Sequence, residues 1–564
     1  IATNTSSFLV GDFADSVKEA KNLVGMHYFF HPAKNRLVDV IGHADTDPGV
    51  LQRAWTFQER IGKTPIASAD APGFVVNRYF VPWLNEAVRL HEEGHSIATI
   101  EAAGKKAFGV GMGPFELMNV TGVPIALHAA RALAERLGGF YTPAERLAEQ
   151  VDKGCPWRID GRPQAKGSEE IEARLWGAVL HPVLELLSEE VTGAADVDIG
   201  ARVGLRWPIG PCEKMAVIGG EAAADLAKDV GDRYRAATPA ALKDLAAGGD
   251  LPQVERVRLT IRDGVATLLI NRPDQLNALD PETMAQLEAR FAEAEARADV
   301  HGIVIAGAGK AFVAGADVKF FVDRMRSGDV DEIIAFADNG QKIFRRIERS
   351  TKRVVCRLDG MALGGGAELA LACHVIVATE RAVFGFPETG IGIYPGLGGT
   401  QRLTRRLGRG TARYLLYTGT TLSAGDLEKT KLAWRVVSPD DLEDTLRMAI
   451  DEAPVQEPAD KETMPSGLRD VGRFLGAVSA DGLLDGSLTL PGGVEIMEVA
   501  RKIRRKAPQA IRSVAVLTEL ADEGDLDAGL AAETEGLKSI FRTADALEGM
   551  SALLEKRRPS FKGE

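Results

Sequence analysis

The sequence predicts a multidomain chain of α/β and all-α domains in series, and three observations carry this prediction. Short strand-like and helix-like segments alternate through residues 1–70. Within a helical middle region, Gly113-Pro114-Phe115-Glu116 recurs as Gly210-Pro211-Cys212-Glu213, which indicates a duplicated unit. After residue 255, a hairpin-like pair of strands precedes alternating β and α segments. The 564 residues are enough for about three or four domains.

Composition and charge exclude several classes of protein. Apolar residues make up 45% and charged residues 26% of the chain, as in ordinary globular proteins. The net charge of −12 argues against a general nucleic-acid surface. No apolar run approaches the roughly 18 residues of a membrane span. The four cysteines form no C-x-x-C pair, which indicates free thiols in a reducing, cytoplasmic compartment and predicts no metal site.

The first α/β region and the residues that follow it carry four recognisable motifs. Residues 23–30 and 37–41 are strand-like, and residues 48–60 are helix-like. The motifs are Thr3-Asn4-Thr5-Ser6-Ser7, Gly25-Met26-His27-Tyr28-Phe29, Leu37-Val38-Asp39-Val40-Ile41 and Pro72-Gly73-Phe74-Val75-Val76-Asn77-Arg78. With these motifs at fixed intervals, the region resembles 3-hydroxyacyl-CoA dehydrogenase.

This resemblance implies residue roles in the oxidation of a secondary alcohol by NAD. His27 would be the general base, because imidazole titrates near neutral pH. Asp39 would orient the imidazole and stabilise its charged form. Ser6 and Asn77 would bind the substrate by hydrogen bonds. Without the other matches, His27 fits better as a structural histidine.

Three departures from the family concern the partner of His27 and the cofactor. Asp39 stands where the family usually has glutamate, and Phe30 or His31 replaces an asparagine that contacts the nicotinamide. No G-x-G-x-x-G turn follows a strand, so residues 1–70 are expected to be only the C-terminal part of a Rossmann NAD-binding domain. We therefore expect impaired NAD binding in this chain and a longer intact protein.

The middle of the chain is expected to contain two copies of one helical domain. Residues 71–165 match the helical domain of the dehydrogenase, and residues 166–247 form a degenerate second copy without the catalytic residues. Leu84-Asn85-Glu86 and Val183-Leu184-Glu185 repeat in the same way. The second copy is expected to act in packing or in closing the binding site. Residues 248–254 are the expected linker.

The C-terminal half is predicted to be α/β with final helices. The core spans residues 255–452 and starts with a hairpin around Asp263-Gly264, followed by a helix over residues 281–298 and a buried strand over 302–306. Residues 453–494 are rich in Pro, Asp and Gly, which predicts an insertion or a flexible segment. Residues 495–564 form the final helices.

Three consecutive glycines, Gly364 to Gly366, precede an apolar segment in which a helix is expected to begin near Ala367. The free N–H groups of a helix start suit an oxygen that gains negative charge. Glu368 lies at this helix start, which predicts an ionised base. Glu388 follows a short apolar run, so burial should raise its pKa and make it an acid. Spacing alone favours a simpler interpretation, two solvated glutamates beside a tight turn.

The surrounding motifs favour a catalytic pair over two solvated glutamates. They are GMALGGGAELALACHVIVA and FGFPETGIGIYPGLGGTQRL, with Asn271-Arg272-Pro273, Asn277-Ala278-Leu279 and residues 311–317 upstream. Residues 255–450 and 530–562 thereby resemble the enoyl-CoA hydratase/isomerase (crotonase) family, with its ββα-repeat fold. The resemblance implies an oxyanion hole made by the Ala316 and Gly365 N–H groups, catalytic roles for Glu368 and Glu388, and a substrate contact at Gly396.

Together the two resemblances predict a bifunctional enzyme of fatty-acid β-oxidation. It would hydrate a trans-2-enoyl-CoA and then oxidise the 3-hydroxyacyl-CoA with NAD; coenzyme A enters as the thioester substrate. Three alternatives stay open: an enoyl-CoA isomerase, a non-catalytic acyl-CoA-binding protein with a relic dehydrogenase half, and an acyl-CoA hydrolase. A homo-oligomer built through the final helices is expected. Three basic clusters, around Arg402, Lys502 and Lys556, suit either CoA phosphates or solvated faces.

Overall fold

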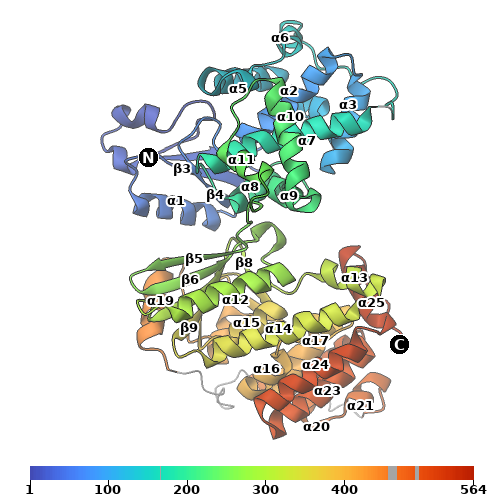
Figure 1. The fold of residues 1–564 in the computed structure, drawn as a ribbon. Coiled ribbons are helices and arrows are strands. Elements are labelled where there is room, and N and C mark those ends of the chain that lie inside the picture. Colours follow the sequence, from blue (N-terminus) through green and yellow to red (C-terminus); the bar gives the residue numbers. More distant parts are fainter. Residues whose placement is uncertain (166, 455–465, 489–493) are drawn as a thin grey trace. The chain divides into compact units, whose positions relative to one another are not determined.

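The computed structural model describes residues 1–165, 167–454, 466–488 and 494–564 of the protein. The chain divides into two compact units, Ile1–Glu255 and Arg256–Glu564 (Figure 1). No helix in the described ranges is both long enough and apolar enough to cross a membrane.

The N-terminal unit begins with a four-stranded sheet in the order β1-β2-β3-β4. Its strands are β1 (Ala2–Thr3), β2 (Val24–Tyr28), β3 (Leu37–Gly42) and β4 (Thr64–Ala69). The β2–β3 pair is antiparallel, whereas β3 and β4 run parallel. Parallel neighbours need a crossover, and α1 (Pro48–Arg60) provides it. Asp47 caps this helix by accepting from the Gly49 and Val50 N–H groups. The predicted α/β segment is confirmed.

The rest of this unit is helical and repeats one capping device. Glu101 accepts hydrogen bonds from the Gly113 and Phe115 N–H groups at the start of α4, and Asp198 accepts one from Cys212 N at the start of α9. The repeated Gly-Pro motifs therefore mark helix starts that buried carboxylates cap. The helices are α2 (Val76–Glu92), α3 (Ile97–Phe108), α4 (Pro114–Thr121), α5 (Val123–Leu137), α6 (Glu145–Asp152), α7 (Ser168–Ser188), α8 (Ala194–Ile199), α9 (Pro211–Ile218), α10 (Gly220–Arg233) and α11 (Ala240–Ala246).

The C-terminal unit contains two sheets between which successive strands alternate. The six-stranded sheet has the order β14-β11-β9-β7-β6-β5 and the four-stranded sheet the order β13-β12-β10-β8. The pairs β7/β8, β9/β10 and β11/β12 each place one strand in each sheet, which is the expected ββα repeat. The strands are β5 (Val257–Arg262), β6 (Val265–Ile270), β7 (Gly302–Gly307), β8 (Ala311–Ala314), β9 (Arg353–Leu358), β10 (Met361–Leu363), β11 (Val375–Thr379), β12 (Val383–Gly385), β13 (Leu422–Ser423) and β14 (Arg435–Val437).

The predicted hairpin is the antiparallel pair β5–β6, in which Arg262 lies opposite Val265. Asp263 and Gly264 between them have φ values of 49° and 75°. Two positive φ values suit the two-residue turns that match the twist of a hairpin, and Asp-Gly is a preferred sequence there.

The helices of this unit cover the sheets and continue to the C-terminus. They are α12 (Pro281–Ala296), α13 (Val318–Ser327), α14 (Val330–Arg349), α15 (Gly365–Ala372), α16 (Gly399–Leu407), α17 (Arg409–Thr418), α18 (Ala424–Lys429), α19 (Leu442–Asp451), α20 (Ser466–Ala477), α21 (Ala480–Asp485), α22 (Val494–Ile503), α23 (Pro508–Glu523), α24 (Leu526–Ile540) and α25 (Ala544–Leu554).

The stretch expected to be an insertion or flexible segment contains two of these helices, α20 and α21. A Cβ on Gly410 of α17 would lie 1.8 Å from the Gly472 carbonyl oxygen of α20, so the two helices touch through their backbones. Glycine at both positions permits this close approach. The glycine content of the stretch, which predicted irregular structure, therefore reflects close packing of helices here. Residues 455–465 and 489–493 of the stretch lie outside the described residues.

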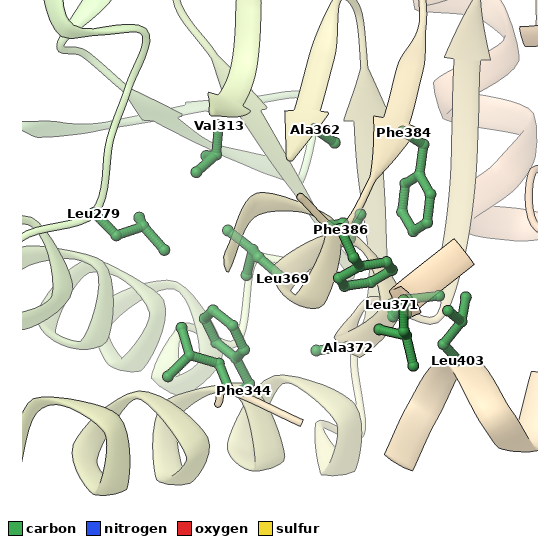
Figure 2. Packing of buried hydrophobic residues seen from close by; sticks show 14 of the residues in the cluster. Leu279, Val313, Phe344, Ala362, Leu369, Leu371, Ala372, Phe384, Phe386 and Leu403 are labelled. Atoms are coloured by element: carbon green, nitrogen blue, oxygen red, sulfur yellow. The ribbon is translucent and has the colours of Figure 1, made fainter. Parts of the chain in front are cut away.

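The core of the C-terminal unit surrounds α15, all eight residues of which are buried. Figure 2 shows Leu369 and Leu371 of this helix among side chains from strands and neighbouring helices, including Val313, Ala362, Phe384, Phe344 and Leu403. A helix that is apolar on every side belongs in a core. Glu368 is the one ionisable residue on it, and a buried carboxylate in such surroundings is costly unless it is compensated.

Candidate active site

The glycine triplet forms the turn from β10 into α15, and each outer glycine has a steric reason. Gly364 has φ 51° and ψ −121°, a backbone conformation that L residues with a side chain rarely adopt. A Cβ on Gly366 would lie 1.9 Å from the Val313 carbonyl oxygen, so only glycine lets α15 pack against β8. The turn therefore places the first N–H groups of α15 beside the end of β8.

The two expected oxyanion donors lie close together in this turn. A Cβ built on Gly365 would be 3.8 Å from Ala316 N. Ala316 pairs with Leu279 in an isolated parallel bridge, whose hydrogen bonds run from Leu279 N to Gly315 O and from Asp317 N to Leu279 O. The bridge therefore fixes the backbone at Ala316 without using its N–H group, as an oxyanion donor requires.

Asn277 explains why the NAL motif accompanies the site. Its Nδ2 donates to the carbonyl oxygens of Ala308, Ala311 and Phe312, and its Oδ1 accepts from Arg272 N. The side chain is fully buried. Asn277 therefore connects the loop before Leu279 to β8 by hydrogen bonds. Its role is to stabilise the loop and not to take part in the reaction.

Glu368 is buried, and the hydrogen bonds that compensate for its burial come from the start of α16. The sequence predicts that they come from the start of α15. The Oε1 atom of Glu368 accepts hydrogen bonds from Leu397 N and Gly399 N, both at 2.7 Å, at the start of α16. Burial raises the pKa of Glu368 to about 7, although the two N–H groups oppose the shift. The prediction that the start of α15 keeps Glu368 ionised is wrong in direction, because the loss of water outweighs the helix terminus.

Glu388 lies in a short 3-10 helix, Glu388–Ile391, and is 7% exposed. Burial and then the nearby charge of Glu368 raise the pKa of Glu388 well above its ordinary value. Among the described residues its Oε2 has no hydrogen-bond partner. A buried, protonated carboxyl group with a free oxygen can give a proton to a bound molecule.

Gly364 is the point at which the turn and Glu388 meet. A Cβ on Gly364 would lie 2.7 Å from Glu388 Oε1. We expect Gly364→Ala to displace the carboxyl group and to reduce turnover on an enoyl-CoA by roughly a hundredfold, the cost of misplacing a reacting group by about 1 Å. Steady-state kinetics with the variant and wild type measures this.

Gly408→Ala is the matched control, because Gly408 also has a positive φ, 77°, but no atom lies within 4 Å of the added Cβ. It introduces backbone strain without touching a carboxylate. Equal losses of activity in the two variants would show that strain, and not displacement of Glu388, explains the effect.

A third buried carboxylate, Glu533 of α24, lies at the same turn and is absent from the sequence prediction. It accepts hydrogen bonds from Gly398 N and Thr400 N, between and beside the donors of Glu368. The signal that identifies it is its position in the inward-facing stripe of α24, with Leu530 and Leu537, where an unpaired glutamate would be costly. Apolar periodicity alone does not reveal its partners.

Gly396, an expected substrate contact, lies in the same loop. Its carbonyl oxygen accepts from Gln341 Nε2 at 2.9 Å, and a Cβ there would lie 2.8 Å from Leu537. The position needs glycine for packing against α24. Arg402 of the nearest basic cluster is 3% exposed and donates to Glu348 and to the Leu397 carbonyl oxygen, so it supports the loop from inside.

The dehydrogenase residues gather in the N-terminal unit. His27 Nδ1 lies 2.8 Å from Asp39 Oδ2, so the shorter aspartate still reaches the imidazole. His27 is 6% exposed and Asp39 is fully buried. Burial raises the pKa of Asp39, and the His27 partner opposes that shift. The antiparallel pairing of β2 with β3 places the two residues opposite each other.

Ser6 and Asn77 line one small pocket. The ring of His27 lies 5.7 Å from that of Phe74, next to the pocket residue Gly73. Phe74, which contacts the imidazole, and Gly73, which lines the pocket, are thus adjacent in the turn between β4 and α2, while His27 is not among the residues that line this pocket. Among the described residues, no group of three or more His, Cys, Asp and Glu side chains has an arrangement that could hold a metal ion.

Comparison with known proteins matches both units to families. Residues 1–71 match the 3-hydroxyacyl-CoA dehydrogenase NAD binding domain, residues 73–166 the 3-hydroxyacyl-CoA dehydrogenase C-terminal domain, and residues 260–466 the enoyl-CoA hydratase/isomerase family. The chain is 32% identical over 307 residues to a short-chain-enoyl-CoA hydratase of Clostridium acetobutylicum, covering 54% of this chain and 97% of the relative.

Two further relatives share the same half of the chain. A crotonyl-CoA hydratase of Syntrophomonas wolfei is 32% identical over 308 residues, covering 54% of this chain and 98% of the relative. A solved enoyl-CoA hydratase of Rhodobacter sphaeroides is 24% identical, covers 55% and 93% of the two chains, and has a TM-score of 0.48. The protein therefore belongs to the enoyl-CoA hydratase/isomerase family through its C-terminal unit, joined in one chain to 3-hydroxyacyl-CoA dehydrogenase domains.

Proposed function

We propose that the protein is a β-oxidation enzyme that hydrates trans-2-enoyl-CoA thioesters and passes the 3-hydroxyacyl-CoA to its dehydrogenase unit. One observation carries the hydratase assignment. Two buried carboxyl groups with raised pKa values, Glu368 and Glu388, flank a turn whose N–H groups suit a charged oxygen. The hydratases among its relatives support the same reaction.

The proposed hydration uses these residues in one sequence of bond changes. The thioester oxygen accepts hydrogen bonds from the Ala316 and Gly365 N–H groups, which stabilise its enolate-like charge. Glu368 takes a proton from water, and the water oxygen bonds to C3 of the enoyl group. The electron pair of the double bond moves toward C2, which takes a proton from Glu388. Proton transfer between the two carboxyl groups and solvent then restores both.

The dehydrogenase step would begin at His27. Its imidazole would take the hydroxyl proton of the 3-hydroxyacyl-CoA, with Asp39 holding the ring and Ser6 and Asn77 holding the substrate. NAD, the proposed cofactor, would supply the hydride acceptor when bound, and the match to an NAD binding domain supports it. Residues 1–71 contain no glycine-rich turn that could hold the pyrophosphate of NAD.

One assay tests both activities. Crotonyl-CoA is added to the protein and the loss of enoyl-thioester absorbance is followed, after which NAD is added to the same sample. We expect loss of absorbance without release of free thiol. Conversion of a 3-enoyl-CoA without hydration would favour an isomerase, and thiol release would favour a hydrolase. Because residues 1–71 lack the glycine-rich pyrophosphate turn, we expect little NADH after the second addition, and rapid NADH formation would contradict the expected impairment of NAD binding.

The pH dependence of hydration follows from the two carboxyl groups. Glu368 must be ionised to act as base, and its pKa is raised to about 7, so kcat/KM should fall about tenfold per pH unit below that value. The fall at high pH should follow ionisation of Glu388, whose pKa is also raised. A profile of kcat/KM against pH measures this. An acid limb near pH 4.5, the ordinary value for glutamate, would contradict a buried base.

We also propose a homo-oligomer and a cytoplasmic location. Val516 and Leu520 of α23 are 57% and 40% exposed and lie one helical turn apart, which supports contact through the final helices. Light scattering of the purified protein tests this, and a monomeric mass would contradict it. The four free cysteines support a reducing compartment, which cell fractionation tests.

A further inference from the structure

The backbone that leads into α16, Leu397 to Thr400, donates alternately to two buried carboxylates. Leu397 N and Gly399 N donate to Glu368 Oε1, both at 2.7 Å. Gly398 N donates to Glu533 Oε2 at 2.7 Å, and Thr400 N donates to Glu533 Oε1 at 3.0 Å. The four consecutive N–H groups of a helix start thus divide between one carboxylate from α15 and one from α24.

Further contacts attach Glu533 to the same loop. The Thr400 hydroxyl donates to Oε1, and Gln341 Nε2 of α14 donates to Oε2 at 3.2 Å. The same amide nitrogen donates to Gly396 O, and the Tyr394 hydroxyl donates to the Glu533 carbonyl oxygen at 2.7 Å. Glu533 is fully buried, so these groups replace all of its water.

No residue of the turn itself can replace Glu533 as the acceptor of these hydrogen bonds. Gly398 is the N-cap of α16, has φ 102° and has no side chain with which to cap the helix. Without Glu533, two buried N–H groups of the first turn would lose their acceptors. The turn would have to shift, and the Leu397 and Gly399 N–H groups, which alternate with these two along the chain, would shift with it.

We propose that Glu533 is a positioning residue of the hydratase, which holds the start of α16 so that Leu397 N and Gly399 N remain directed at Glu368. The inference rests on the proposed hydratase function and goes beyond its catalytic pair. Glu533 acts only through Glu368 and makes no contact with substrate in this role.

The positioning role has a distinct pH signature. Burial and then the charge of Glu368 raise the pKa of Glu533 to about 8. At the pH of the acid limb Glu533 is therefore neutral, and it affects Glu368 through the donors that it positions. The Leu397 and Gly399 N–H groups lower the pKa of Glu368, so their displacement should make Glu368 harder to ionise. The ionisable groups coupled to this pair are Glu388, Arg402, Arg405 and Tyr394. The Glu533 charge also raises the pKa of Glu388, so the acid limb, and not the alkaline limb, reports the positioning of Glu368.

Glu533→Gln tests the proposal. Both oxygens of Glu533 accept hydrogen bonds, whereas the amide nitrogen of glutamine is a donor and cannot replace one of them. We expect kcat for crotonyl-CoA hydration to fall roughly tenfold to a hundredfold with KM little changed. The acid limb of the pH profile should move to higher pH, because the displaced Leu397 and Gly399 N–H groups no longer lower the pKa of Glu368. Glu533→Asp, which keeps a carboxyl group as acceptor for the Gly398 and Thr400 N–H groups, should return the limb toward its wild-type position. Glu535→Gln on the same helix, at an exposed side chain paired with Lys538, is the matched control.

The outcomes separate the two levels of the argument. If wild type does not hydrate crotonyl-CoA, the hydratase assignment fails. If wild type is active and Glu533→Gln leaves both kcat and the acid limb unchanged, or changes KM alone, the positioning role is overturned. If Glu533→Gln does not fold, Thr400→Val decides, because it removes one donor from Glu533 and Gln401 keeps its bond to Leu517 O. It should shift the limb in the same direction, and an unmoved limb would contradict the proposal.

Discussion

Glu388→Gln should lower kcat for enoyl-CoA hydration by about a hundredfold to ten-thousandfold, the usual contribution of a general acid or base. The amide has nearly the shape of the carboxyl group but does not release a proton at neutral pH. Because Glu388 Oε2 has no partner among the described residues, the substitution breaks no hydrogen bond at that atom. Steady-state rates with crotonyl-CoA measure the loss.

Glu368→Gln should cause a loss of similar size for a different reason. Leu397 N and Gly399 N both donate to the Oε1 atom of Glu368. A glutamine can accept both hydrogen bonds with its carbonyl oxygen, so the fold should be kept. What it loses is basicity. Glu380→Gln, at an exposed position between the two, is the control and should leave the rate unchanged.

Comparing the loss of activity in Glu388→Gln with that in Glu368→Gln distinguishes a hydratase from an isomerase. A hydratase needs a base for water and an acid for C2, so both variants should be nearly inactive. One inactive and one active variant would indicate a single base, as isomerisation requires. Two active variants would remove the carboxyl groups from the chemistry altogether.

Gly365→Pro should lower kcat by about a hundredfold to a thousandfold, the effect of removing one oxyanion donor, about 2.7–4 kcal/mol. Gly365 is the first residue of α15, where proline fits the helix and removes only an N–H group that has no acceptor within the helix. Gly364 before it has φ 51° and ψ −121°, the mirror image of the extended conformation that precedes proline. The helix should therefore remain.

Gly365→Ala is the control for this substitution, because it adds a Cβ and keeps the N–H group. Its Cβ would lie 3.4 Å from Leu279 and from Leu397, ordinary contacts, so most activity should remain. Circular dichroism and thermal unfolding report whether both variants fold. Equal activity of two folded variants would show that the Gly365 N–H group does not stabilise the transition state.

Local patterns were sufficient to predict much of the fold. Alternation of apolar residues and Asp263-Gly264 predicted the β5–β6 hairpin, which the structure confirms. The start of α15 lies two residues before the expected Ala367, because Gly365 and Gly366 already have helical geometry. Residues close in sequence carry these signals.

The environment of Glu368 depended on distant residues and could not be predicted in this way. Its sequence neighbours indicated a helix start and therefore an ionised carboxylate, whereas burial in the core raises its pKa. Its true donors lie in the loop before α16, and Glu533 comes from α24. Which helix start faces which carboxylate is set by packing of the whole unit, and hydrophobic periodicity contains no information on it.

Hydration of crotonyl-CoA in water enriched in heavy oxygen shows directly whether the protein adds water to C3 of an enoyl-CoA. Mass spectrometry of the product would locate the label. We expect an intact thioester with one heavy oxygen on the acyl chain, at C3, and loss of this product in Glu368→Gln. An unlabelled acyl chain, or label found only in a free carboxylate after loss of CoA, would contradict this expectation.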